Sequence, residues 1–177
     1  MGEPTEPKPV KLFTGLLTST PEVLEEVEAE LSARYGKIER RSPLIPFDYT
    51  DYYDEETGEG IKREFLAFEE LVDPGRLPEI KLETNELEVC FSREFDIDLP
   101  RPVNIDPGYI GLSKLVLATT KNYSHRIYLR DGIFAEVTLR YRKGGFEPLP
   151  WTYPDYRSQD YIDFFAETRE LYLDQLE

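Results

Sequence analysis

Cysteine, methionine, histidine and glutamine are nearly missing from this chain of 177 residues. The first three occur once each, and the two glutamines are Gln159 and Gln175. The lone cysteine, Cys90, excludes an intrachain disulfide framework and a zinc site built from cysteines, so we expect a cytoplasmic protein. Few thermolabile side chains and many charged ones are typical of heat-adapted proteins, so we also expect a thermophilic source.

Long apolar runs and the common enzyme motifs are missing as well. No stretch approaches the roughly 20 apolar residues that a membrane span needs. The chain contains no G-x-x-x-x-G-K-[ST], G-x-G-x-x-G, H-E-x-x-H or G-x-S-x-G pattern, which disfavours the usual nucleotide hydrolases, dinucleotide enzymes, zincins and serine hydrolases. Residues 1–9 lack the features of a signal peptide. We interpret them as a flexible arm before a single domain over residues 10–177.

Positive charge is scarce overall but concentrated in one stretch. The chain has 36 acidic residues against 21 Lys and Arg, a formal net charge of -15. Such a field repels nucleic-acid phosphates and anionic lipid headgroups, so we expect neither nucleic acid nor membrane as a partner. The exception lies between residues 114 and 143, where the cations are Lys114, Lys121, Arg126, Arg130, Arg140, Arg142 and Lys143. This stretch is where the sequence favours a local anion pocket.

Hydrophobic periodicity predicts the elements of the first half. Residues 10–18 form a short apolar run typical of a buried strand, and Thr20-Pro21 marks the start of a helix that ends at Gly36. The helix has one apolar stripe: Val23, Leu24, Val27, Leu31 and Tyr35. We expect an edge strand over 37–41, a strand over 61–71 and a second amphipathic helix from Pro78.

The second half is less regular. We expect a short strand over 103–105 that enters a turn at Asp106-Pro107-Gly108. Residues 112–120 fit a helix or a buried strand, and we favour the helix. We expect a hairpin with a three-residue loop over 130–132 and Gly132 left-handed, which sets Arg126 opposite Glu136. A helix should follow from Ser158.

This order of elements predicts an α+β fold with a mainly antiparallel sheet and helices packed on it. The order strand, helix, strand, strand, helix, strand permits a ferredoxin-like βαββαβ unit followed by a hairpin and a covering helix. Other antiparallel sheets with helices on one face fit the same order.

Four nearby basic side chains form the preferred candidate site. Lys114, Lys121, His125 and Arg126 could together hold a phosphate or a carboxylate, although an ordinary polar face has the same composition. Histidine is the side chain whose unperturbed pKa lies near neutrality, so the single histidine, His125, is a candidate catalytic acid or base, or else a residue at the core edge. Asp106 is the candidate catalytic carboxylate; the plainer interpretation is a residue that starts a turn.

Two aromatic segments offer further candidates. Residues 47–59 are rich in acids and tyrosines, so Asp48 and Asp51 are candidate ligands for Mg²⁺, although the spacing is not that of an EF-hand and a solvated loop is the plainer interpretation. In the same loop, Tyr49 and Tyr52 either pack on the domain or contact a ligand. The segment PLPWTYPDYR (148–157) is a lid or a packing strap, and its Trp151 is a ligand platform or a core anchor.

Five stretches carry a resemblance to a known family. They are PVKLFTGLL, PFDYTDYY, VNIDPGYIGLSKLVLATTKNYSHRIYL, AEVTLRYRKG and PLPWTYPDYR. In this order and at these distances they resemble a prokaryotic family called domain of unknown function 4416, over nearly the whole chain. The resemblance implies no defined activity, because members are uncharacterised and some carry only the label "GTP-binding protein". Residues 120–123 (Thr-Lys-Asn-Tyr) do not match the guanine-reading Asn-Lys-x-Asp motif.

Two functions remain open from the sequence. The first is a small-molecule protein, with or without catalysis, that recognises a phosphorylated or nucleotide-like anion, with Asp106 as general base or as a ligand of Mg²⁺. GTP enters only through the family label. The second is a non-catalytic interaction module that presents aromatic side chains of the two segments to a protein partner.

Overall fold

The computed structural model describes residues 2–177, which form one sheet and four helices. The sheet order is β2-β4-β1-β5-β6-β8-β7, with β3 paired to β4 and β9 paired to β8. The strands are β1 (Val10–Thr18), β2 (Ile38–Arg41), β3 (Ile45–Pro46), β4 (Lys62–Val72), β5 (Asn104–Ile110), β6 (Lys114–Thr119), β7 (Ile127–Arg130), β8 (Ile133–Arg142) and β9 (Gly145–Pro148). The helices are α1 (Leu24–Tyr35), α2 (Asp54–Thr57), α3 (Leu77–Glu94) and α4 (Gln159–Leu176).

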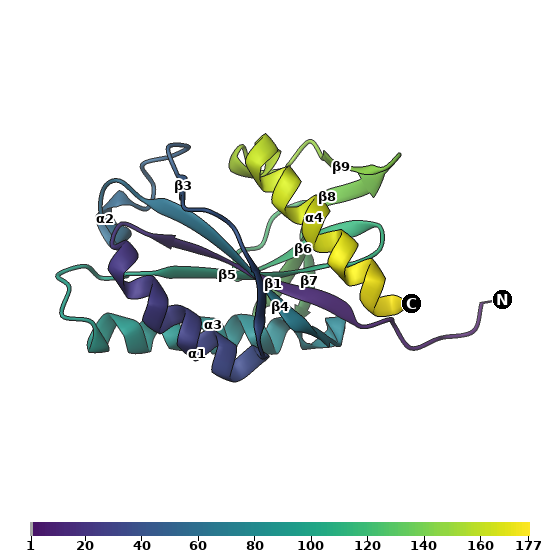
Figure 1. Ribbon diagram of the computed structural model, residues 1–177, viewed down its shortest axis with the longest axis horizontal. Helices are drawn as coiled ribbons and strands as arrows, with labels where there is room; N and C mark the ends of the chain where they lie inside the picture. The colour runs from purple at the N-terminus through teal and green to yellow at the C-terminus, as the bar shows by residue number, and fades with distance from the viewer. Residues whose placement is uncertain (1) are drawn as a thin grey trace.

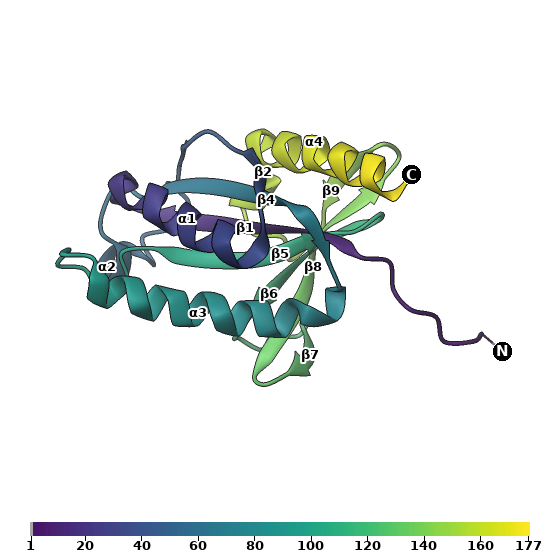
Figure 2. The same cartoon turned by 60° about the horizontal axis from the view of Figure 1, so that its bottom comes forward.

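The two faces of the sheet are covered by different helices. Helices α1 and α3 lie on one face and α4 lies on the other, as the two views show (Figures 1 and 2). Strand β1 serves both faces because its side chains alternate: Leu12 and Leu16 belong to the core under α1 and α3, and Phe13 belongs to the core under α4. The expected α+β class with helices on an antiparallel sheet is confirmed.

The second core is dominated by aromatic rings. Phe65 on β4 is fully buried, and its ring contacts those of Tyr161 and Phe165 at centroid distances of 4.6 and 4.9 Å. Truncating a buried phenylalanine to alanine costs about 3–5 kcal/mol in typical cores. This cluster therefore anchors α4 and the segment before it to the sheet.

The first half of the chain has the ferredoxin-like order. Strands β2, β4, β1 and β5 are neighbours in that sequence, and each neighbouring pair is antiparallel. The crossover helices α1 and α3 cover the same face (Figure 2). This is the arrangement of a split βαβ unit. Strands β6 to β9 extend the sheet beyond β5.

Most helices and strands lie where periodicity places them, but two segments have a different conformation from the one predicted. The expected turn at Asp106-Pro107-Gly108 is continuous strand, because all three residues pair with β1. Pairing with β6 begins only at Gly108, so Pro107 lies where the strand has an edge-like side and tolerates a missing N–H. Residues 114–119 form strand β6, not a helix, because they pair with β5 and β8.

The hairpin between β7 and β8 has the expected register, but its loop is shorter than predicted. Asp131 and Gly132 both have positive φ, 53° and 79°, so the loop has two residues, as Asp-Gly favours, and the three-residue prediction was wrong. An irregularity between Tyr128 and Arg130 supplies the one-residue offset. Tyr128 therefore still lies opposite Phe134, as expected.

The residues before β1 and the lengths of the helices can be compared with the expectations of an amino-terminal arm and of no membrane span. Residues 2–9 form no helix or strand, and their side chains are exposed. They extend from the start of β1 away from the sheet (Figure 1). Among residues 2–177, no helix has the length and apolar character to cross a membrane.

Candidate functional site

A cleft of about 680 Å³ opens at the end of the molecule that carries α2. The start of β4, the start of β5, the end of β6 and residues 153–156 contribute to its walls. Its aromatic lining consists of Phe47, Tyr49, Tyr52, Tyr53, Tyr153 and Tyr156. Its charged lining consists of Glu56, Arg63, Lys81, Arg101, Asp106, Lys121, Glu136 and Asp155. A volume of this size suits a small organic molecule.

Arg63 lies at the base of the cleft. It is on the same face of β4 as Phe65, so its guanidinium is buried beside the aromatic core. Its Nη1 lies 3.5 Å from Asp106 Oδ2 and its Nη2 lies 3.4 Å from Asp155 Oδ2. Burial acts to lower the pKa of Arg63, but the surrounding phenolic and carboxyl groups outweigh burial and raise this pKa above its ordinary value. The guanidinium therefore stays charged.

Asp106 links Arg63 to two other polar side chains. Lys81 Nζ lies 3.7 Å from Asp106 Oδ1, and Asn104 Nδ2 donates to Asp106 Oδ2 at 2.7 Å. Burial acts to raise the pKa of Asp106, but Lys81 and Arg63 outweigh burial, so this pKa lies below its ordinary value. At neutral pH Asp106 is a carboxylate, which accepts hydrogen bonds and does not supply a proton.

Glu88 is a buried carboxylate that orders the neighbouring wall of the cleft. Its Oε1 accepts the backbone N–H of Ile105 at 2.6 Å, and its Oε2 accepts from Arg101 Nε at 2.8 Å. Burial raises the pKa of Glu88, although Arg101 and Lys81 oppose it. Arg101 also donates its backbone N–H to the carbonyl of Glu56 at 2.9 Å, which fixes α2 against the cleft.

Glu136 on β8 is also a buried carboxylate, and its partners lie outside the cleft. Its Oε2 accepts from Arg126 Nε at 2.9 Å and lies 3.0 Å from His125 Nε2. Thr138 Oγ1 donates to Glu136 Oε1 at 3.2 Å. The expected cross-strand pair of Arg126 and Glu136 is therefore confirmed, and it orders this wall of the cleft.

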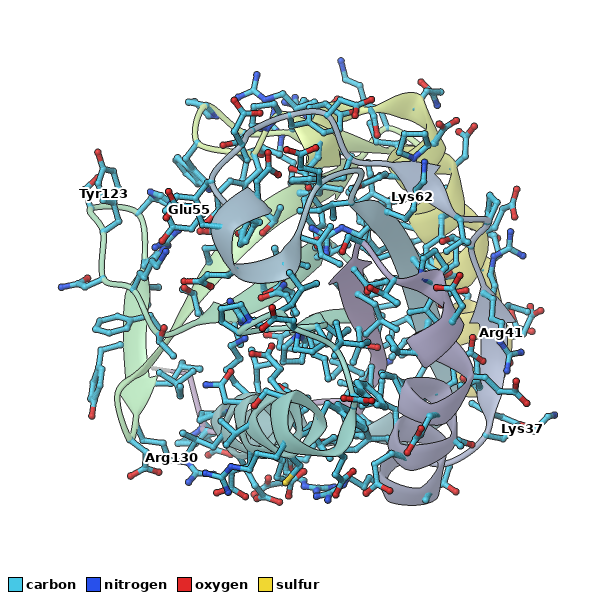
Figure 3. The ribbon with its side chains drawn as sticks, turned by 90° about the vertical axis from the view of Figure 1, so that its left-hand side faces the viewer. Lys37, Arg41, Glu55, Lys62, Tyr123 and Arg130 are labelled. Atoms are coloured by element: carbon cyan, nitrogen blue, oxygen red, sulfur yellow. The ribbon has the colours of Figure 1, made fainter. Side chains whose placement is uncertain are left out.

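The aromatic loop both packs and presents side chains. Phe47 packs with Leu17, Ile61 and the partly buried Tyr53 in a small core of its own. Tyr49 and Tyr52 remain 43% and 63% exposed at the mouth of the cleft. Lys121 Nζ donates to Tyr52 Oη at 3.0 Å and lies 4.7 Å from its ring centroid. Figure 3 views this end, with Glu55 of α2 in front of the strands.

The structure gathers part of the predicted site. Asp106, Lys121, Tyr49 and Tyr52 all line the cleft. Lys114 does not, because it is exposed at the opposite end of β6 from Thr119 and pairs in register with Arg140. The predicted group of four cations is therefore corrected: its members do not meet in one pocket.

Other candidate residues lie outside the cleft. His125 and Arg126 contact Glu136 and are not among the lining residues. Trp151 is half-exposed; its Nε1 donates to the carbonyl of Val137 at 2.8 Å and its ring stacks on His125 at 5.3 Å. These contacts make Trp151 a packing residue of the 148–157 segment, so a role as ligand platform is not supported.

The candidate metal ligands Asp48 and Asp51 lie outside the cleft and outside any group of possible metal ligands in the described part of the chain. Asp48 and Asp51 are exposed and do not line the cleft. Over residues 2–177, no three His, Cys, Asp or Glu side chains form a group that could hold a metal ion.

Sequence reasoning missed Arg63, Lys81, Arg101 and Asp155. For Arg63 a signal was available, since a cation at the even spacing of Phe65 and Ala67 faces the core and needs carboxylate partners. A sequence signal was also available for Lys81, because Lys81 and Glu88 are seven residues apart and both lie on the buried stripe of α3. Nothing local marks Arg101 or Asp155, because their roles depend on chain segments brought together only by folding.

Comparison with known proteins gives a family and no activity. A family model described as a domain of unknown function (DUF4416) matches residues 8–172. Searches of curated proteins and of solved structures found no match.

Proposed function

Because the chain belongs to the DUF4416 family, whose description carries no activity, we propose a function from the cleft itself: it binds a small phosphorylated or nucleotide-like anion. The observation that carries this proposal is that the ammonium of Lys121 has no carboxylate partner in the described part of the chain. The other lining cations Arg63, Lys81 and Arg101 each have a carboxylate within 4 Å. Within residues 2–177, the ammonium of Lys121 forms no ion pair, and its hydrogen-bond partner is Tyr52 Oη.

The position of Lys121 suits an anion that enters from solvent. A lysine ammonium is a point charge with three donors, of which Tyr52 Oη takes one. The chain as a whole carries a formal charge of -15. An anion is therefore repelled from most of the surface, and the end of β6 is one place where a free cation offsets that field.

The tyrosines support the organic part of such a ligand. Tyr49, Tyr52 and Tyr153 present ring faces and hydroxyls at the mouth, where they can pack against a sugar or a base. Asp106, ionised at the floor, can accept a hydrogen bond from the ligand. The proposal is one of binding, and Asp106 would be the first residue to test for a catalytic role.

Thermal unfolding against a ligand panel tests this proposal. A ligand that binds only the folded state raises Tm, so we expect a rise with at least one of phosphate, pyrophosphate, ribose 5-phosphate, AMP and GTP. Lys121→Gln should reduce the rise. The matched control is Lys114→Gln, an exposed lysine on the same strand away from the cleft. Equal shifts in both variants, or no shift with any compound, would refute the proposal.

A second candidate function is supported by a different surface. Strand β7 is one edge strand of the sheet, and its Ile127 is 70% exposed beside exposed Tyr128 and Leu129. Tyr123, in the loop before it, projects away from the body (Figure 3). An exposed apolar edge of this kind is a place where a protein partner can bind. A partner retained by the wild type and lost with Ile127→Ser plus Tyr128→Ser would support this function.

A further inference from the structure

The charges at the base of the cleft cancel among themselves. Arg63 lies between Asp106 and Asp155, and Lys81 lies on the other side of Asp106. Two cations therefore meet two carboxylates, and Asn104 adds only a neutral amide. A further negative charge at this depth would have no free cation to meet. The base is suited to a neutral group that forms hydrogen bonds.

The base also holds a hydroxyl without a partner. Tyr156 lines the cleft and is only 2% exposed, yet its Oη forms no hydrogen bond within residues 2–177. Burial raises the pKa of Tyr156 well above its ordinary value, so the group is a neutral hydroxyl. Buried hydroxyls are normally paired, so this unpaired hydroxyl, on a side chain that lines the cleft, is a group that a ligand hydroxyl could satisfy after a small shift of the ring.

The carboxylates at the base keep capacity for another donor. The contacts of Arg63 with Asp106 and Asp155 are 3.5 and 3.4 Å long. Charge-assisted bonds are usually about 2.7–2.9 Å. Asp106 offers about four lone-pair sites, and Arg63, Lys81 and Asn104 contact three of them. A ligand that both accepts from Tyr156 and donates to a carboxylate fits this environment.

We propose that the ligand is a sugar phosphate, bound with its phosphate at Lys121 and its hydroxyls at the base beside Tyr156 and Asp106. This deepens the proposed function and rests on it. A sugar hydroxyl is neutral, accepts one hydrogen bond and donates another, which is the combination that the base lacks. The shared chemistry is a phosphorylated ring with hydroxyls, supplied by a free sugar phosphate or by the ribose of a nucleotide.

Isothermal titration with three proteins and two probes tests the orientation. Wild type, Tyr156→Phe and Lys121→Gln are each titrated with ribose 5-phosphate and with inorganic phosphate. Wild type should bind ribose 5-phosphate at least about tenfold more tightly than phosphate, since hydroxyl contacts are added. Tyr156→Phe should weaken ribose 5-phosphate about three- to tenfold and leave phosphate unchanged. Lys121→Gln should weaken both probes.

The outcomes separate the two proposals. If Tyr156→Phe binds ribose 5-phosphate as wild type does, the orientation is overturned while an anion site at Lys121 stands. If wild type binds no phosphate compound, both proposals fail. The Tm of unliganded Tyr156→Phe should match wild type, because no hydrogen bond is lost. A further titration with AMP identifies the source: tighter binding than ribose 5-phosphate assigns a nucleotide, and weaker binding assigns a free sugar phosphate.

Discussion

Arg63 on β4 reaches Asp106 on β5 across the strand that separates them. The residue of β1 between them is Gly15, which pairs with Phe65 on one side and with Asp106 on the other. A Cβ at Gly15 would lie 2.8 Å from Arg63 Nη1 and 3.0 Å from Phe65 Cε1. Because Gly15 has no side chain, the guanidinium of Arg63 can extend over β1 and reach Asp106 in the cleft.

We expect Gly15→Ala to destabilise the protein by about 1–3 kcal/mol, because the added methyl group overpacks a filled site. Urea denaturation measures the change. The control is Gly145→Ala, where a Cβ meets nothing within 4 Å and which should change stability little. Wild-type stability in Gly15→Ala would show that the guanidinium does not need this path.

Loss of the buried cation should be costly in itself. Arg63→Gln leaves Asp106 and Asp155 with less compensation at the base of the cleft, and we expect a loss of about 3–5 kcal/mol. Arg34→Gln removes an exposed pair with Glu30 on α1 and should cost less than about 0.5 kcal/mol. Similar stabilities for the two variants would contradict the coupling of charges at the base.

Glu64 predicts a pH dependence of stability. Burial, and then the nearby Glu28, raise its pKa to about 7, with Arg41 opposing, and its Oε2 has no partner within residues 2–177. In the unfolded chain a glutamate has a pKa of about 4.3. Because the folded pKa is the higher one, this group's contribution is fully present below about pH 4.3 and is lost as pH rises through about 7.

Glu64→Gln should therefore be more stable than wild type at pH 8, by about 1 kcal/mol, and the difference should shrink towards pH 5. Denaturation curves at a series of pH values measure it. Glu55→Gln, an exposed glutamate on α2, serves as the control and should show no such trend. A constant difference across pH would mean that Glu64 does not titrate in this range.

Trp151 should act on stability and not on ligand affinity. Trp151→Phe keeps an aromatic ring beside His125 and removes the hydrogen bond to Val137, so we expect a loss of about 1 kcal/mol. Affinity for ribose 5-phosphate, measured by titration, should stay within twofold of wild type (on the order of experimental scatter), since Trp151 does not line the cleft. A tenfold loss of affinity, about 1.4 kcal/mol, would restore the lid hypothesis.

Sequence periodicity predicts α1, α3 and α4 well because each has one apolar stripe, as the positions from Val23 to Tyr35 illustrate. Strand β6 was missed because its apolar run is too short to show a period. Its conformation is decided by pairing with β5 and β8. Likewise Asp106-Pro107-Gly108 has the composition of a turn, but pairing with β1 keeps it extended.

The residues of the candidate site also differ in whether local sequence could identify them. Asp106 and Lys121 were identified from residue type and local context, and both line the cleft. Lys114 was grouped with Lys121 because they are close in sequence, but a strand advances about 3.3 Å per residue, so opposite ends of β6 are far apart. Arg63 and Asp155 meet only because distant segments fold together, which one sequence does not reveal.

The central claim is that ligand binds in the cleft beside Lys121, and an NMR titration of backbone amides with ribose 5-phosphate tests it most directly. We predict chemical-shift changes concentrated at residues 104–106, 119–121 and 153–156, with little change at Lys114 or along β7. Changes centred on Tyr128 and Ile127, or no changes at saturating ligand, would contradict the claim and favour the exposed sheet edge as the functional surface.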